Sequence, residues 1–159
     1  MSYRIGFGID FHQLTEGREL WIGGVMIPYP KGALGHSDAD VLLHSICDAM
    51  LGALALGDIG MHFPDTDPRY HNIDSKILLR QTYNLVKQKS YRVINIDSSI
   101  CLEVPKIKMY SGQMRSIIAE ILEVTIEEIS IKATTTEKLG FVGREEGLVA
   151  YATALLSKV

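Results

Sequence analysis

The chain has 159 residues, of which 47% are hydrophobic and 22% are charged, and its formal net charge is −3. This composition is typical of a folded globular protein and excludes an intrinsically disordered chain. The longest apolar run, 49–57, is much shorter than the roughly 20 residues of a membrane-spanning helix. The lysines and arginines are scattered and form no basic cluster for nucleic acid. We therefore expect one domain over residues 1–159, with neither a membrane nor a nucleic acid as partner.

Two further features bear on compartment and assembly. The N-terminus reaches Asp10 and His12 before an apolar signal segment could develop, which favours a cytoplasmic protein. Cys47 and Cys101 lie far apart in apolar surroundings without a Cys-x-x-Cys motif, so we expect buried free thiols. A chain of this size often makes only a shallow site by itself, so oligomerisation is a reasonable expectation.

Hydrophobic periodicity and turn residues predict both strands and helices. In chain order we expect strands over 3–10, 20–22 and 25–27, helices over 37–56 and 74–89, a strand over 91–104, a helix around 114–122 and a strand over 129–133. The glycine pair 23–24 predicts a tight hairpin, and Ser37 is expected to cap the first helix. The clearest strand is 91–104, where apolar and polar residues alternate up to Pro105. The apolar segment 148–156 fits either a helix or a strand.

Strands and helices intermix without strict alternation, which predicts an α+β fold whose sheet is covered by helices on one face. Gly6 and Gly8 lie inside the first strand, so they indicate room for close packing rather than a dinucleotide fingerprint. The loop 58–72 has the residues of turns, and its length favours a functional role. Within it, Asp65 and Asp67 fit turn residues better than an acid–base pair.

Asp10 and His12 are the first candidate metal ligands. They are two residues apart on a strand, so both side chains leave the same face. His44 on the first helix is the best third ligand, and Ser37 lies nearly two helical turns before it on the same side. Two histidines and one aspartate with an open fourth position are typical of a catalytic zinc site. Spacing alone favours a simpler interpretation, a hydrogen-bonded surface pair and a core histidine.

Two segments suit a phosphate. His36 and Ser37 offer an imidazole, a hydroxyl and free backbone N–H groups at the expected helix start, although simple capping explains them equally well. The segment 134–144 gathers hydroxyls, the carboxylate of Glu137, cations and glycines, which suits a phosphate with a divalent metal. A hydroxyl-rich turn with solvated charges is the alternative.

Taken together, these motifs resemble one known family. They are Asp10-Phe11-His12, His36-Ser37-Asp38-Ala39-Asp40, His44, Asp58-Ile59-Gly60, Phe63-Pro64-Asp65-Thr66-Asp67 and the run from Lys132 to Phe141. Their order and spacing over essentially the whole chain resemble the 2-C-methyl-D-erythritol 2,4-cyclodiphosphate synthases. The resemblance implies an enzyme of the non-mevalonate isoprenoid pathway that converts 4-diphosphocytidyl-2-C-methyl-D-erythritol 2-phosphate into the cyclic diphosphate and releases CMP. It also implies a mixed sheet, a strand over 148–156, and a homotrimer with active sites at the subunit interfaces.

The resemblance further implies a role for individual residues. Asp10, His12 and His44 would bind Zn²⁺, and Glu137 would bind Mg²⁺ or Mn²⁺ on the diphosphate. His36 and Thr135 match residues that stabilise the transition state. The implied substrate contacts are Asp10, His12, His36, Ser37, Asp58, Ile59, Gly60, Phe63, Asp65, Asp67, Pro105, Lys106, Ala133, Thr134, Thr135, Thr136, Glu137, Phe141 and Arg144. Among them, Pro105, Lys106 and 133–135 match the cytidine pocket.

The chain departs from the family pattern at two places. Phe7 stands where some members carry histidine, and 102–104 with Lys108 replaces a stretch that usually has other residues.

The substrate that the resemblance implies carries its own nucleophile, the 2-phosphate, so no general base is expected. Two other functions fit the same residues: a metal-dependent nucleotide hydrolase, and a trimeric nucleotide-binding module without turnover.

Overall fold

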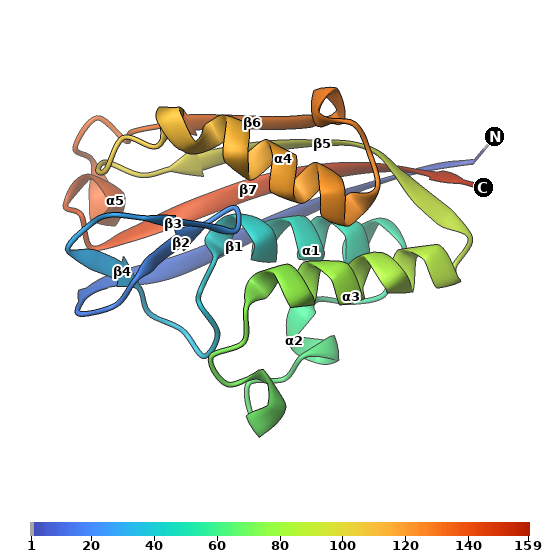
Figure 1. Ribbon diagram of the computed structural model, residues 1–159, viewed down its shortest axis with the longest axis horizontal. Coiled ribbons are helices and arrows are strands. Elements are labelled where there is room, and N and C mark those ends of the chain that lie inside the picture. The colour runs from blue at the N-terminus through green and yellow to red at the C-terminus, as the bar shows by residue number, and fades with distance from the viewer. Residues whose placement is uncertain (1) are drawn as a thin grey trace.

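A computed structural model describes residues 2–159 and contains a five-stranded sheet and a separate hairpin (Figure 1). The order in the larger sheet is β4-β1-β7-β5-β6. Its strands are β1 (Tyr3–Glu16), β4 (Lys31–Ala33), β5 (Tyr91–Cys101), β6 (Ile129–Thr134) and β7 (Gly147–Lys158), and the hairpin pairs β2 (Leu20–Ile22) with β3 (Val25–Ile27). β5 and β6 run parallel and the other neighbours antiparallel, so the sheet is mixed.

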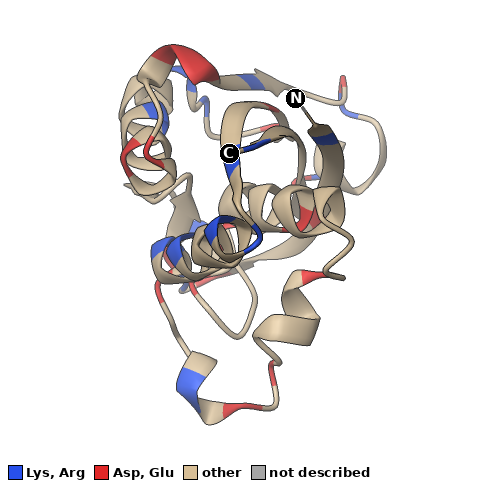
Figure 2. Cartoon of the chain, turned by 90° about the vertical axis from the view of Figure 1, so that its right-hand side faces the viewer, with Lys and Arg blue, Asp and Glu red and all other residues tan. Residues whose placement is uncertain are grey.

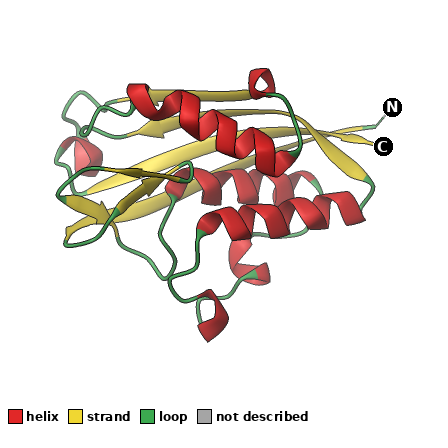
Figure 3. Ribbon diagram, in the orientation of Figure 1, coloured by secondary structure: helices red, strands yellow, loops and turns green. Residues whose placement is uncertain are grey.

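Three long helices cover one face of this sheet, as the sequence predicts (Figure 3). They are α1 (Val41–Ala53), α3 (Ser75–Gln88) and α4 (Ser111–Leu122). The short elements are α2 (Ile59–His62), α5 (Gly140–Gly143) and the 3₁₀ helices η1 (Pro68–Tyr70), η2 (Lys108–Tyr110) and η3 (Ile126–Glu128). Both α2 and η1 lie within the predicted loop 58–72 and extend away from the sheet beyond α1 and α3 (Figure 1).

The first helix begins four residues later than predicted. Its N-cap is Asp40, whose carboxylate accepts the Leu43 N–H at 3.0 Å, rather than Ser37. The same fully buried carboxylate also accepts the backbone N–H groups of Gly23 and Gly24, at 2.9 and 2.7 Å. Ala39 adopts a φ of 56°, which interrupts the helical path before Asp40. A contact with the distant hairpin therefore decides where α1 starts.

Two strand boundaries also differ from the prediction. β1 continues to Glu16 instead of Asp10, because it pairs with β7 from Tyr3 to Gln13 and then with β4, a strand that the sequence pattern missed. Pairing along the whole of β7 confirms the strand over 148–156 and leaves the two chain ends side by side (Figure 1).

The strand β5 ends at Cys101, three residues before the predicted end. A bulge between Val93 and Asn95 shifts its alternation, so that Val93 is buried and Ile94 is not. From Ile96 onward the predicted buried face is correct. A bulge of this kind inserts one residue into the period of two and is invisible to simple pattern matching.

Other sequence expectations concern cysteines, charge and membranes. Both cysteines are free thiols; Cys47 is fully buried, which raises its pKa to about 12, but Cys101 is only partly buried, contrary to prediction. Figure 2 shows acidic and basic residues interspersed over the elements. Within residues 2–159, no helix is long and apolar enough to cross a membrane.

The glycines of β1 allow α1 to lie directly on the strand. A Cβ atom on Gly6 would lie 1.9 Å from the carbonyl oxygen of Ala49, and one on Gly8 would lie 2.0 Å from that of Ser45. These distances are far below van der Waals contact, and the atoms they meet are backbone, which cannot move aside without displacing the helix. The expected close packing at these glycines is confirmed.

We expect Gly8→Ala to lower the free energy of unfolding by about 3 kcal/mol, at the upper end of the usual cost of overpacking, because α1 must move off β1. The matched control is Gly112→Ala in α4, where an added Cβ meets nothing within 4 Å. There the better helix propensity of alanine is expected to add up to about 1 kcal/mol. Chemical denaturation at one fixed protein concentration measures both, and equal effects would contradict the packing argument.

Candidate functional site

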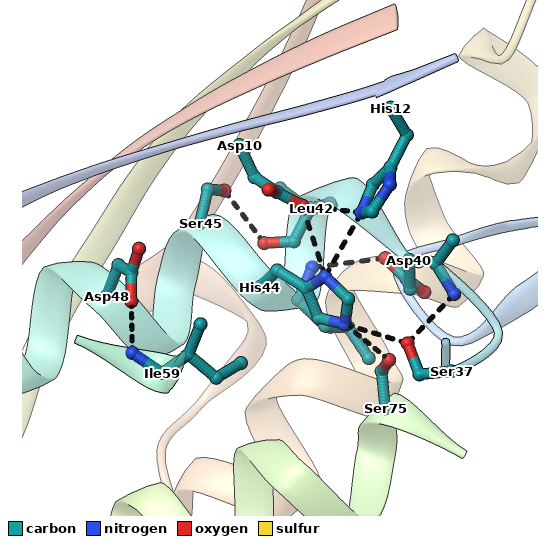
Figure 4. A network of polar contacts seen from close by, with 12 residues as sticks. Asp10, His12, Ser37, Asp40, Leu42, His44, Ser45, Asp48, Ile59 and Ser75 are labelled. Carbon is teal, nitrogen blue, oxygen red and sulfur yellow. Dashed lines mark hydrogen bonds and ion pairs between the residues drawn. The ribbon is translucent and has the colours of Figure 1, made fainter. Parts of the chain in front are cut away.

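Asp10, His12 and His44 converge at one point between β1 and α1 (Figure 4). The His12 Nε2 and His44 Nδ1 atoms lie 2.9 and 3.1 Å from the same Asp10 oxygen, Oδ2, and 3.3 Å from each other. All three side chains are mostly buried, with exposed fractions of 25%, 16% and 12% in chain order. The structure thus brings together the three residues predicted as metal ligands.

Local structure explains this convergence. Asp10 and His12 follow Gly6 and Gly8 at alternate positions of β1, so all four face α1. The helix touches the strand at Gly8 through the carbonyl of Ser45, and His44 is the preceding residue. The glycine contact therefore sets the distance between the strand ligands and the helix ligand.

The hydrogen bond of His12 determines which of its ring nitrogens is free. Its Nδ1 lies 2.9 Å from the carbonyl oxygen of Leu34, which can only accept, so in the neutral ring Nδ1 donates and Nε2 presents a lone pair to Asp10. Backbone carbonyls commonly orient metal-binding histidines in this way. Two ring nitrogens and a carboxylate oxygen around one centre fit a divalent cation.

Asp10 and His44 shift each other's pKa values. Burial by itself would raise the pKa of Asp10, but hydrogen bonds and charge from His12 and His44 outweigh it, and the pKa is lowered. Burial by itself would lower the pKa of His44, but Asp10, with Asp40 and Asp38 behind it, outweighs burial and raises that pKa. The local field thus favours positive charge at this point, as a cation site requires.

A pocket of about 310 Å³ opens over the two histidines. Of the predicted site residues it is lined by His12, His36, Ser37, His44, Ile59, Gly60, Phe63 and Asp65. The His36 Nε2 atom lies 3.7 Å from Asp65 Oδ2, and both side chains are about two-thirds exposed, at 65% and 66%. The His36 ring and the Asp65 carboxylate therefore stand at the exposed mouth, and His12 and His44 lie inside.

Some pocket residues were not predicted from the sequence. Tyr70 and Phe63 pack edge to face with ring centroids 5.5 Å apart, and Ile73 and Leu78 complete the apolar wall. Asp48 in α1 accepts the Ile59 N–H at 2.7 Å and so ties the loop to the helix. Tyr70, Ile73, Leu78 and Asp48 lie outside the recognisable motifs, and among these only Tyr70 falls within the loop 58–72 whose length favoured a functional role.

Asp58 and Asp67 support the loop instead of lining this pocket. Asp58 caps α2 by accepting the Met61 N–H at 3.0 Å. Asp67 caps η1 and pairs with Arg69 at 2.6 Å, and hydrogen bonds from Arg69 lower the pKa of Asp67. The turn interpretation of Asp67 is therefore confirmed.

The remaining predicted residues gather elsewhere on the chain. Thr135 Oγ1 donates to Glu137 Oε1 at 3.1 Å, and the Thr136 N–H donates to Glu103 at 3.3 Å, which joins the turn after β6 to the segment after β5. A second pocket of about 320 Å³, lined by Ile107, Lys108 and Ala133 among others, adjoins this turn. In the described part of the chain, none of these residues lines the pocket over the histidines.

The last two predicted contacts are Phe141 in α5 and Arg144 directly after this helix. The Phe141 ring lies 6.2 Å from the ring of Phe11 on β1, centroid to centroid. Arg144 pairs with Glu146 through two 3.0 Å hydrogen bonds on the exposed surface. One chain therefore carries two separate groups of predicted site residues: a metal half around His44, and a hydroxyl half formed by Pro105, Lys106 and 133–137.

Comparison with known proteins is consistent across the whole chain. The model of the YgbB family matches residues 3–157. The 2-C-methyl-D-erythritol 2,4-cyclodiphosphate synthase of Bacteroides thetaiotaomicron is 60% identical over 158 residues, covering 99% of each chain. The structure of the bifunctional IspDF from Campylobacter jejuni superposes with a TM-score of 0.95 at 43% identity over 99% of this chain, which spans only 43% of that longer one. A 2C-methyl-D-erythritol-2,4-cyclodiphosphate synthase in its CDP-bound form superposes with a TM-score of 0.89 at 36% identity, covering 97% of this chain and all of that one (100%).

We expect metal-stripped protein to take up one divalent cation per chain, and His44→Ala to weaken that binding by more than about 100-fold. Loss of a ligand should exceed the 10–100-fold typical of a lost outer partner. Competition with a chromophoric chelator measures the affinity. His62→Ala is the control, because His62 binds the Leu56 carbonyl outside the cluster. Full metal content in the His44 variant would contradict the ligand assignment.

Proposed function

The chain belongs to the YgbB family, and from this membership we propose how its residues carry out the reaction of the 2-C-methyl-D-erythritol 2,4-cyclodiphosphate synthases to which it is related. It converts 4-diphosphocytidyl-2-C-methyl-D-erythritol 2-phosphate into 2-C-methyl-D-erythritol 2,4-cyclodiphosphate and releases CMP, as a lyase of isoprenoid precursor biosynthesis. One domain over residues 1–159 would perform this step, and the cytoplasm is the compartment that we expect.

The convergence of Asp10, His12 and His44 beneath the pocket is the single observation that carries the mechanism. We propose Zn²⁺ as their ion, since two imidazoles and one carboxylate with an open position suit catalytic zinc. When bound, Zn²⁺ supplies Lewis-acid polarisation of the phosphate that is attacked. Because the three side chains are mostly buried, little water screens that interaction, which strengthens it.

The chain's main task in this mechanism is to position the substrate. The 2-phosphate of the substrate attacks the β-phosphate, so a bond forms within one molecule, CMP leaves in line, and no side chain has to remove a proton. His36 and Ser37 at the pocket mouth would hold the anionic phosphates, with His36 as a donor to the transition state. Bringing the two ends of one substrate together can supply several kcal/mol of the barrier.

The hydroxyl half would hold the leaving nucleotide. Glu137 presents its carboxylate next to the Thr135 hydroxyl on an exposed turn, an arrangement that suits Mg²⁺ or Mn²⁺ on the diphosphate. Thr135 would act there as a second donor to the transition state. Pro105, Lys106 and Ala133 would form the cytidine pocket, and the CDP-bound relative supports a ligand of this class.

A homotrimer would unite the two halves at each interface. The outward side of β1 exposes Ile5, Phe7 and Phe11 with exposed fractions of 71%, 61% and 53%. The long helices lie on the other face of the sheet, so this row stays uncovered in residues 2–159 (Figure 1). A continuous apolar row on a strand is typical of a subunit interface. It supports an assembly in which the metal half of one chain faces the hydroxyl half of the next.

The reaction itself is tested by phosphorus NMR of the purified protein with 4-diphosphocytidyl-2-C-methyl-D-erythritol 2-phosphate, Zn²⁺ and Mg²⁺. We expect two coupled diphosphate resonances of a cyclic product, together with CMP. Linear phosphate products would instead establish the hydrolase. Unchanged substrate with folded, metal-loaded protein would leave only the nucleotide-binding module.

Mixed assemblies test whether the site is shared between chains. His44→Ala and Glu137→Gln are each expected to be inactive alone, but a trimer that contains both variants should regain about a third of wild-type activity, because one of its three interfaces pairs two intact halves. Activity is measured on hybrids isolated through two different affinity tags. The matched control combines His44→Ala with His12→Ala, which damage the same half and should not rescue each other. Inactive hybrids of the first pair would contradict a shared site.

A further inference from the structure

The ring of His44 has polar partners on the side that faces away from Asp10 (Figure 4). Its Nε2 atom lies 2.8 Å from Ser75 Oγ, at the first turn of α3, and 3.3 Å from Ser37 Oγ. Ser75 is fully buried, so water cannot replace its hydroxyl in this contact. Nδ1 faces the other candidate metal ligands, and Nε2 on the opposite side of the ring therefore has a fixed protein partner.

Asp38 decides which way the Ser75 hydroxyl points. The Asp38 carboxylate accepts the Ser75 N–H at 3.0 Å through Oδ2, and its Oδ1 lies within hydrogen-bond distance of Ser75 Oγ. A carboxylate has only acceptors, so the serine proton must lie on the line to Asp38. The Asp38 backbone is itself anchored, because its N–H donates to the Ile73 carbonyl at 3.1 Å.

Because the Ser75 hydroxyl donates its proton to Asp38, Ser75 Oγ can only accept a hydrogen bond from His44. In its neutral form His44 must then carry its proton on Nε2, which leaves the lone pair of Nδ1 directed at Asp10 and His12. Ser37 does not change this result, because its contact with His44 Nε2 is longer, 3.3 Å against 2.8 Å for Ser75. The chain Asp38–Ser75–His44 has one consistent direction of donation.

We propose that Ser75 and Asp38 are positioning residues that hold the His44 ring in the tautomer and orientation needed to bind the metal. This role rests on the metal site proposed above. Neither residue touches the cluster of ligand atoms, and the serine joins α3 to a ligand on α1. Ligand histidines usually donate their second N–H to such an outer partner, and loss of the partner weakens metal binding about 10–100-fold.

The test measures metal affinity without turnover, by titrating Zn²⁺ into metal-stripped protein against a chromophoric chelator. Ser75→Ala removes the acceptor and should weaken binding about 10–100-fold. The matched control is Ser45→Ala, another fully buried serine, whose hydroxyl donates to the Leu42 carbonyl and does not contact the ring. The control variant should bind Zn²⁺ as tightly as wild type.

Asp38→Asn tests the direction of the hydrogen bond between His44 and Ser75. It also provides a second test if Ser75→Ala fails to fold. The amide oxygen of the new side chain can still accept the Ser75 N–H, and its nitrogen can donate to Ser75 Oγ. The serine hydroxyl then points its own proton toward His44 Nε2. The neutral ring would then carry its proton on Nδ1, where the metal must bind. Nitrogen-15 NMR of labelled histidines, at a pH where His44 is neutral, reports the tautomer, and we expect Nε2–H in wild type and Nδ1–H in this variant.

The outcomes separate this inference from the proposed function. Wild-type affinity and tautomer in both Ser75→Ala and Asp38→Asn would overturn the positioning role while leaving the metal site intact. Absence of Zn²⁺ binding by wild type would overturn the metal site itself. Weakened binding in both variants with an unchanged Ser45→Ala control would support the positioning role.

Discussion

The close approach of α1 to β1 is the constraint on which the site depends. The backbone carbonyls of Ser45 and Ala49 occupy the space where side chains of Gly8 and Gly6 would lie. At this separation an aspartate and a histidine on the strand can reach a histidine on the helix; a helix held farther away by ordinary side chains would separate the ligands by more than a coordination shell. The glycines therefore serve the chemistry without taking part in it, and the usual entropic cost of glycine in a strand is offset by this geometry.

The same convergence is unfavourable in a protein without a cation. When both rings are neutral, a carboxylate oxygen and two nitrogen lone pairs lie within 3.3 Å of one another in a mostly buried position, where water compensates them only partly. The opposite shifts of the Asp10 and His44 pKa values show that positive charge beside the Asp10 carboxylate, on a protonated ring or a bound cation, relieves this cost. Selection for stability alone would replace such a cluster with apolar residues, so its presence is best explained by a bound ion.

Local interactions account for the parts of the structure that the sequence predicts well. The hairpin needs only the glycines at 23–24, and the helix after Asp74 needs only its own cap and apolar periodicity. The errors arise where distant segments meet. Asp40 replaces Ser37 as the cap because the hairpin binds its carboxylate, and strand β4 exists because β1 offers it an edge. Among the site residues, Asp10 and His12 follow from strand alternation, but Ser75 lies 31 positions from His44 and no spacing rule connects them.

The alternation of β1 links catalysis to assembly. Its even positions from Gly6 to His12 face α1, where two provide close packing and two are candidate metal ligands. Its odd positions from Ile5 to Phe11 point to the uncovered face and form the apolar row that a neighbouring chain can bury. Because the period of a strand is two, a shift of one residue in its pairing with β7 would exchange both sets at once. The metal half and the proposed interface are therefore specified by the same register, so one strand would position a site that another chain completes in the proposed trimer.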